Sequence, residues 1–169
     1  SIVTGIHGDE LEGQYVCYLL AKWLNENPEK IKGIIDIYPS MNPMGIDSIT
    51  RNFPFYDVDL NRTFPGHTAD FLPAQVANAI VETVRGSDFA IDIHASNIFL
   101  RELPQVRISR SNAHDLVSLA EKLGIDFIWV HDAVTVLEST FSHAMNSVGT
   151  KTLVVEMGVG MRITKEYGQ

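Results

Sequence analysis

The sequence predicts an α/β domain built on a mostly parallel or mixed sheet with helices on both faces. Short apolar segments typical of strands alternate along the chain with longer segments whose apolar residues recur at helical spacing. This alternation favours a sheet that is covered on both sides. The chain has 169 residues, 45% of them hydrophobic, which suits one domain with a single substantial core.

The first half of the chain is expected to hold two strands, one long helix and an extended loop. Residues about 1–6 form an apolar strand, and a helix over about 10–26 ends at Asn27-Pro28. A second strand covers about 33–38. The stretch from about 40 to 71 is rich in Pro, Asn, Asp and Gly, yet it holds aromatic residues that can pack. A structureless loop of this length is usually functional, so we expect it to contribute to a site.

The second half of the chain repeats strand and helix more regularly. Val76, Ile80 and Val84 lie one helical turn apart, and Gly124 is a typical residue just beyond a helix end. The expected elements are a helix over about 73–85, strands over about 89–94 and 105–109, a helix over about 112–123, a strand over about 127–131, a short helix over about 139–147 and a strand over about 151–156. In open α/β sheets, ligands bind outside the carboxyl ends of the strands, so we expect the site at that edge.

The composition excludes several classes of function. The net charge of -8 and the lack of a basic run argue against nucleic-acid binding. No apolar run in the sequence is long enough to span a bilayer. The single Cys17 cannot form an internal disulfide; it is expected to be buried, and a cytoplasmic setting fits. The chain begins inside a strand and stops at the start of a new helix, so flanking segments are expected at both ends.

His7, Glu10 and His94 are the candidate metal ligands. His7 leaves the first strand, and Glu10 is expected in the first turn of the following helix, where both side chains can point at one place. Gly5 and Gly8 allow the tight turn. Because His94 also ends a strand, the three form the two-histidine, one-glutamate set of carboxypeptidase-type zinc sites. The alternatives are a solvated turn with a charge at a helix N-terminus, and a hydrogen-bonded structural histidine.

Four further residues are candidates for contacts with a substrate. Asn61 and Arg62 end the long loop, and the planar Arg fork matches a carboxylate, although an Asx turn with a solvated Arg is the alternative. Arg51 belongs to the same loop and is within reach of the same edge. Glu156 closes an apolar strand, where partial burial would raise its pKa and suit a general base. A carboxylate that is simply exposed at the strand end is the alternative.

Four motifs occur in an order and at a spacing that resemble one known family. They are GIHGDE at 5–10, DLNR at 59–62, DIH at 92–94 and VVEMG at 154–158. Across nearly the whole chain the sequence resembles the succinylglutamate desuccinylase/aspartoacylase family, whose members are relatives of the zinc carboxypeptidases. The resemblance implies a zinc-carboxypeptidase-like fold, with residues 1–169 forming the catalytic domain.

The resemblance also implies a role for each candidate residue. The implied roles are His7, Glu10 and His94 as ligands of one Zn²⁺, Glu156 as the base that activates a zinc-bound water, Arg51 as the group that polarises the scissile carbonyl, and Asn61 and Arg62 as the residues that hold a substrate carboxylate. Asp59 would orient His7 from the side away from the metal.

The sequence lacks one of the basic residues that are expected from the family resemblance. Aspartoacylase-like members carry a further substrate-binding Arg shortly before the catalytic Glu, whereas residues 139–150 contain none and His143 is the nearest basic residue. Arg101 or Arg107 could replace it, and each could equally be a surface residue. The remaining histidines are interpreted as structural, namely His67, His114 and His131.

The expected function is that of a zinc-dependent amide hydrolase, a deacylase that acts on a small N-acyl amino acid or a related carboxylate. One alternative is a zinc carboxypeptidase that acts on peptides. Another is a relative that binds a metal or a ligand without catalysis. The expected partner is a small molecule that carries a carboxylate, with neither nucleic acid nor membrane, and a homo-oligomer is left open.

Overall fold

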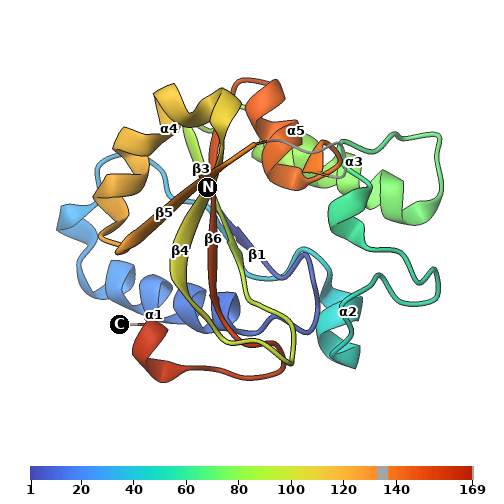
Figure 1. The fold of residues 1–169 in the computed structure, drawn as a ribbon, viewed down its shortest axis with the longest axis horizontal. Helices are drawn as coiled ribbons and strands as arrows, with labels where there is room; N and C mark the ends of the chain where they lie inside the picture. Colours follow the sequence, from blue (N-terminus) through green and yellow to red (C-terminus); the bar gives the residue numbers. More distant parts are fainter. Residues whose placement is uncertain (133–136, 169) are drawn as a thin grey trace.

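A single mixed sheet organises the chain (Figure 1). The computed structural model describes residues 1–132 and 137–168. Within those residues, six strands lie in the order β2-β1-β3-β6-β4-β5. Their bounds are Ile2–Thr4 for β1, Ile37–Tyr38 for β2, Phe89–His94 for β3, Glu102–Ser109 for β4, Phe127–His131 for β5 and Lys151–Gly158 for β6. The predicted α/β class with a mixed sheet is confirmed.

Helices cover both faces of this sheet. The α-helices are α1 at Glu12–Glu26, α2 at Pro43–Ser48, α3 at Leu72–Val84, α4 at Ala113–Ala120 and α5 at Phe141–Ser147. Short 3₁₀ turns lie at Pro28–Lys30, Leu60–Arg62, Arg110–Asn112, Glu121–Leu123 and Lys165–Gly168. Helices α1 and α4 lie on one side of the sheet, and α3 and α5 on the other (Figure 1). No helix in the described part of the chain is long and apolar enough to cross a membrane.

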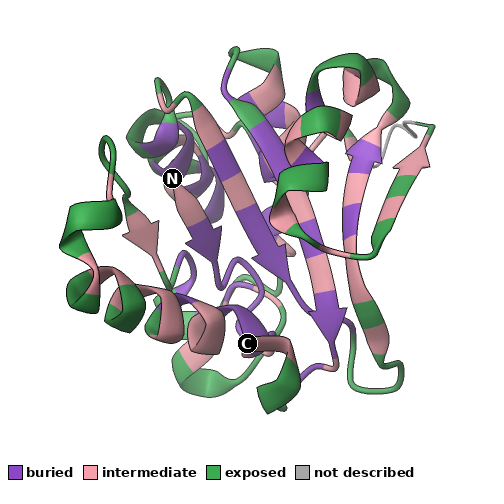
Figure 2. Cartoon of the chain, turned by 90° about the vertical axis from the view of Figure 1, so that its left-hand side faces the viewer, coloured by how far each residue is buried: buried purple, intermediate pink, exposed green. Residues whose placement is uncertain are grey.

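Each face of the sheet packs into its own core. Leu153 and Val155 of β6 pack with Leu116 of α4, whereas Phe141 of α5 belongs to the cluster on the opposite face. Because successive side chains of a strand alternate, Glu156 faces the side of α3 and α5. The central strands are mostly buried, and β5 at the sheet edge exposes alternate residues (Figure 2).

The sheet reverses direction between β6 and β4. Strands β3 and β6 are parallel, with His94 opposite Glu156. Strand β4 is antiparallel to β6, with Gln105 opposite Glu156 and Arg107 opposite Val154. Strand β4 therefore begins at the edge where β3 and β6 end. This reversal brings side chains of β4 to the edge where the site lies. From the sequence, we expected only strand ends and the long loop to contribute residues there.

Several element bounds shift by a few residues, and two elements differ more clearly from the predictions. Helix α2 lies within the stretch predicted to be irregular; the Asn42 side chain accepts from the N–H of Gly45 at 3.0 Å, and Pro43 is the first helical residue. These are ordinary start signals, but a helix of six residues has no apolar period to reveal it. The strand predicted over 33–38 shrinks to Ile37–Tyr38, because β1 pairs with only two of its residues, and Ile34 is 88% exposed.

Glu12 of α1 holds the segment that follows β6. Its side chain is buried, and its two carboxylate oxygens accept from the N–H of Thr164 at 2.8 and 2.9 Å. Gly158 has a φ of +74° and lies so close to Glu12 that a Cβ there would collide with the carboxylate. Cys17 of the same helix is buried, as predicted.

Candidate active site

The connection from β1 to α1 carries His7 and Glu10. Gly5 has a φ of +72°, which turns the chain at the end of the strand. A Cβ on Gly8 would meet the backbone of Gly45 in α2, so glycine is needed for this close approach. Nδ1 of His7 lies 2.7 Å from Oε1 of Glu10. The helix begins only after Glu10, so this carboxylate lies in the connection and not in the first helical turn predicted from the sequence.

Strand β3 brings His94 to the same place. Its Nδ1 lies 2.9 Å from Oε2 of Glu10, and the N–H of Ala95 donates to that oxygen at 2.9 Å. Ligand atoms of His7, Glu10 and His94 all lie within 4.8 Å of one another, and all three residues are buried. Two imidazoles and one carboxylate are the donors of carboxypeptidase-type zinc sites, so the residues present fit such a metal.

A further carboxylate holds each imidazole from behind. Oδ1 of Asp59 lies 2.9 Å from Nε2 of His7, and Oδ2 of Asp92 lies 3.0 Å from Nε2 of His94. These contacts fix both rings with Nδ1 toward the centre. Asp59 lies against His7, as the family resemblance implied. The role of Asp92 was missed, although the period of a strand already placed it on the same face as His94.

Burial and charge act on the pKa values of the cluster in opposite directions. Burial alone would raise the pKa of Glu10, but His94 and His7 outweigh it and hold that pKa well below its usual range. Burial lowers the pKa of His7, whereas Glu10 and Asp59 raise it, and the net result is a raised pKa. For His94, burial is outweighed by Asp92 and Glu10, which place its pKa well above the ordinary value. A metal ion must therefore displace protons from the imidazoles, so acid is expected to weaken its binding.

Arg51 lies across two carboxylates of the cluster. Its Nη1 donates to Oε1 of Glu10 at 3.0 Å, and its Nη2 donates to Oδ2 of Asp59 at 3.2 Å. The side chain comes from the long loop and is 42% exposed, so one side of the guanidinium remains accessible. Arg51 therefore reaches the cluster, as the sequence suggested, and lines the cavity beside it.

Asn61 and Arg62 lie in a 3₁₀ turn that is preceded by Asp59. The Asp59 side chain accepts from the N–H of Asn61 at 2.8 Å. The amide oxygen of Asn61 accepts from the N–H of Phe141 at 2.8 Å, and its Nδ2 lies 3.4 Å from Nε2 of His94. Arg62 is exposed, lines the cavity and donates to the carbonyl of Asn61 at 2.8 Å. Both residues reach the site, but the oxygen of the Asn61 amide is already used to fix the start of α5.

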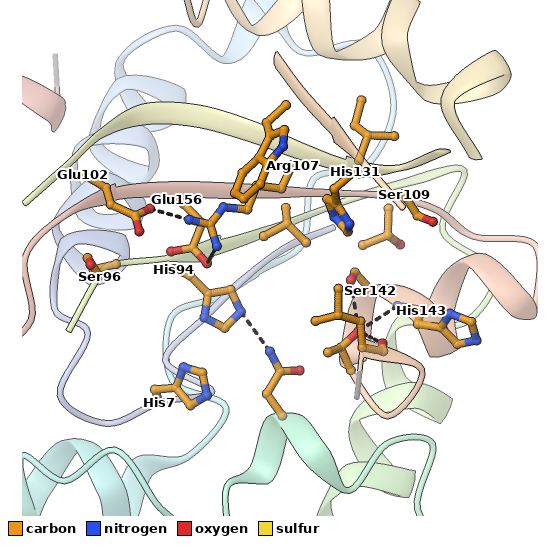
Figure 3. Close-up of a pocket in the computed structure, with 18 of the residues that line it drawn as sticks. His7, His94, Ser96, Glu102, Arg107, Ser109, His131, Ser142, His143 and Glu156 are labelled. Atoms are coloured by element: carbon orange, nitrogen blue, oxygen red, sulfur yellow. Dashed lines mark hydrogen bonds and ion pairs between the residues drawn. The ribbon is translucent and has the colours of Figure 1, made fainter. Parts of the chain in front are cut away.

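Glu156 lies at the end of β6 and faces the cluster. The close-up shows it between His94 and Arg107 (Figure 3). Its side chain is 16% exposed, and burial raises the pKa of Glu156 to about 7, against the opposing effect of His94 and Arg107. A carboxylate with this pKa can both accept and release a proton near neutral pH.

A cavity of about 660 Å³ joins these residues. It extends from the cluster across the sheet face of β6, β4 and β5. Among the basic residues left open by the sequence, Arg107 and His143 line it. Arg101 instead donates to the hydroxyl of Tyr167 at 3.2 Å and stacks on its ring. His131, which we interpreted from the sequence as structural, lines the part of the cavity away from the cluster (Figure 3).

Comparison with known proteins was consistent across sequence and structure. The sequence profile of the succinylglutamate desuccinylase/aspartoacylase catalytic domain matches residues 1–167. An N-alpha-acetyl-L-2,4-diaminobutyric acid deacetylase of Halomonas elongata is 31% identical over 104 residues, which cover 61% of this chain and 30% of that protein.

Solved structures show the same similarity. A succinylglutamate desuccinylase/aspartoacylase from Rhodobacter sphaeroides superposes with a TM-score of 0.81 at 25% identity, covering 98% of this chain and 50% of that chain. A metallo-carboxypeptidase from Burkholderia cenocepacia superposes with a TM-score of 0.70 at 18% identity, and the match covers 92% of this chain and 46% of that chain. This similarity shows a shared fold. The chain spans at most about half the length of these three relatives. The profile match over nearly the whole chain shows that it belongs to the succinylglutamate desuccinylase/aspartoacylase family.

Proposed function

We propose that the protein is a zinc-dependent amide hydrolase that removes the acyl group from a small N-acyl amino acid or a related carboxylate. One observation carries the proposal: His7, Glu10 and His94 converge as buried metal donors, with Glu156 facing them across the same cavity. Similarity to a deacetylase of an acetylated amino acid supports this choice of substrate. The similarity to a carboxypeptidase rests on the fold alone.

His7, Glu10 and His94 would hold the zinc ion, and Asp59 and Asp92 would keep both imidazoles in the orientation that it needs. A zinc ion bound there would polarise the amide carbonyl and lower the pKa of a bound water to about 7. The three donors are buried, and all three line the cavity. A substrate amide must therefore approach from the cavity, where Glu156 lies.

Glu156 accepts the proton of the attacking water and later delivers it to the leaving amine. Burial raises its pKa to about 7 in the metal-free protein, and a bound cation would lower that pKa, so Glu156 is a base that works near or below neutral pH. Arg51 reaches the cluster from the loop, and its accessible side offsets the negative charge that develops on the carbonyl oxygen. Its contacts with Glu10 and Asp59 keep the guanidinium at that place before the substrate arrives.

Arg62 binds the carboxylate of the substrate. Within the described part of the chain, the only hydrogen bond of its side chain goes to the neutral carbonyl of Asn61. The Arg62 side chain forms no ion pair with an acid of that part, although its charge acts on the nearby Asp59 and lowers the pKa of that carboxylate. A planar guanidinium that faces a cavity suits a carboxylate bidentately. Asn61 supports this contact by fixing the turn against α5, and it lines the same cavity.

Hydrolysis by the zinc-loaded protein of a panel of N-acyl amino acids, their neutral amides and short peptides tests the proposal. We expect turnover of one or more N-acyl amino acids, and a loss of roughly 10²–10⁴-fold in kcat for Glu156→Gln with the zinc retained. Turnover of peptides alone would instead indicate a carboxypeptidase. Stoichiometric zinc without hydrolysis of any compound would indicate a binding protein, and a fully active Glu156→Gln variant would refute the assignment of the base.

A further inference from the structure

We propose that Arg107 is a positioning residue that holds the carboxylate of Glu156 in place, and this inference rests on the proposed hydrolysis. The sequence left the role of Arg107 open between a substitute for the missing substrate-binding arginine and a surface residue. The contacts, the register of the sheet and the charges around the guanidinium all favour a third role.

The reversal of strand direction places Arg107 beside Glu156. Arg107 lies opposite Val154 on β6, and Glu156 is the next residue of β6 on the same face. Nη1 of Arg107 donates to Oε1 of Glu156 at 3.3 Å, and Nη2 donates to Oε2 of Glu102 at 2.6 Å (Figure 3). One planar guanidinium therefore joins the first residue of β4 to the carboxylate that faces the metal donors.

The guanidinium is itself held from two further directions. Arg107 lies over the ring of Trp129, its partner on β5, with 5.2 Å between the guanidinium carbon and the ring centroid. Gln105 donates to the same oxygen of Glu102 at 3.0 Å, which fixes that carboxylate. The Arg107 side chain is only 26% exposed. Its head group is thus confined before any substrate arrives, which is what a positioning residue requires.

The local charge argues against a role in binding the substrate carboxylate. Two carboxylates, Glu102 and Glu156, already face the single positive charge of Arg107. A third carboxylate at this place would meet net negative charge. Arg62 donates to a neutral carbonyl, so it remains the better site for the substrate acid. Arg101 lies against Tyr167 and does not line the cavity.

Steady-state kinetics of Arg107→Met and Arg107→Lys, with Arg101→Met as the matched control, test the proposal. We expect Arg107→Met to lower kcat by on the order of 10²-fold with KM nearly unchanged, because misplacing a reacting group by about 1 Å has this effect. Lysine keeps the charge but cannot bridge both carboxylates, so Arg107→Lys should recover part of kcat. Arg101→Met should behave as the wild type. A raised KM with unchanged kcat in Arg107→Met would overturn the proposal, because it would indicate a contact with the substrate.

Thermal unfolding separates this inference from the proposed function. In a cycle of Arg107→Met, Glu156→Gln and the double variant, measured on metal-free protein at one pH, we expect Arg107→Met to lower the Tm by less in the Glu156→Gln background than in the wild type. An equal effect of Arg107→Met in both backgrounds would refute the contact even if the enzyme is active. If the wild type hydrolyses nothing, the proposed function fails, whereas a non-additive cycle would still support the hold on Glu156. Circular dichroism and the zinc content of each variant show whether it has folded. If Arg107→Met does not fold, the same measurements are made on Arg107→Lys.

Discussion

Replacing Glu156 by Gln should change how the stability of the metal-free protein depends on pH. The pKa of Glu156 is about 7 in the folded protein against an ordinary value of 4.5, because burial disfavours its charged form. The folded state therefore binds the proton more tightly than the unfolded chain, and the free energy of unfolding falls as the pH rises from about 4.5 to about 7. At about 1.4 kcal/mol for each tenfold change in proton affinity, the full effect is about 3 kcal/mol. Glutamine cannot ionise, so the variant should lack this part of the pH dependence.

Urea unfolding of both proteins in the presence of a chelator, from about pH 5 to about pH 8, measures the effect. Metal-free protein is required because a bound cation would itself lower the pKa of the carboxyl. We expect the stability of the variant relative to the wild type to increase over this range and to level off above about pH 7. Other titrating groups are shared by both proteins and largely cancel in this difference. Parallel curves across the whole range would refute the reasoning, because Glu156 would then titrate at its ordinary value in the folded protein.

Three further predictions concern the metal, the substrate and the fold. His94→Ala should lose the bound zinc, measured by elemental analysis of protein purified without chelator, and equal zinc in both proteins would disprove the ligand assignment. We expect the wild type to prefer an acid substrate over its neutral amide by about 10- to 150-fold in kcat/KM, which corresponds to about 1.5–3 kcal/mol for a charge-assisted contact. Arg62→Ala should erase this preference, whereas Arg101→Ala should keep it. Glu12→Ala should lower the free energy of unfolding by roughly 1–3 kcal/mol, because it leaves the partly buried N–H of Thr164 without its acceptors, and urea denaturation would show an unchanged midpoint if the contact were unimportant.

The sequence predicted the central strands and the convergence of His7, Glu10 and His94 well, because both depend on short local patterns. The apolar run that ends at His94 and the one that contains Glu156 became neighbouring parallel strands, which brought both residues to one edge. The length of strand β2 was overestimated, because pairing with β1 decides where an edge strand begins, and the apolar character of Ile34 does not. Asp92 could have been recognised from alternation alone.

The role of Arg107 could not be predicted from the sequence. Its contacts depend on β4 running antiparallel to β6, and strand direction is a property of the chain path between elements. A parallel β4 would have placed the start of that strand at the opposite edge of the sheet. The cation that the family carries shortly before its catalytic Glu is absent here, and spacing along the chain gave no means to decide between Arg101 and Arg107 as candidates for that edge.

The position of β6 in the sheet has a consequence for how the protein is made. It is the last of the six strands to leave the ribosome, yet it lies between β3 and β4. Until it is synthesised, β3 and β4 each present a row of unpaired backbone groups, which is the arrangement that promotes pairing between different chains. Folding on the ribosome therefore leaves two partial sheets that only β6 can join. Glu156 arrives with that strand, so a nascent chain that lacks β6 has neither a finished sheet nor the residue that we propose as the general base.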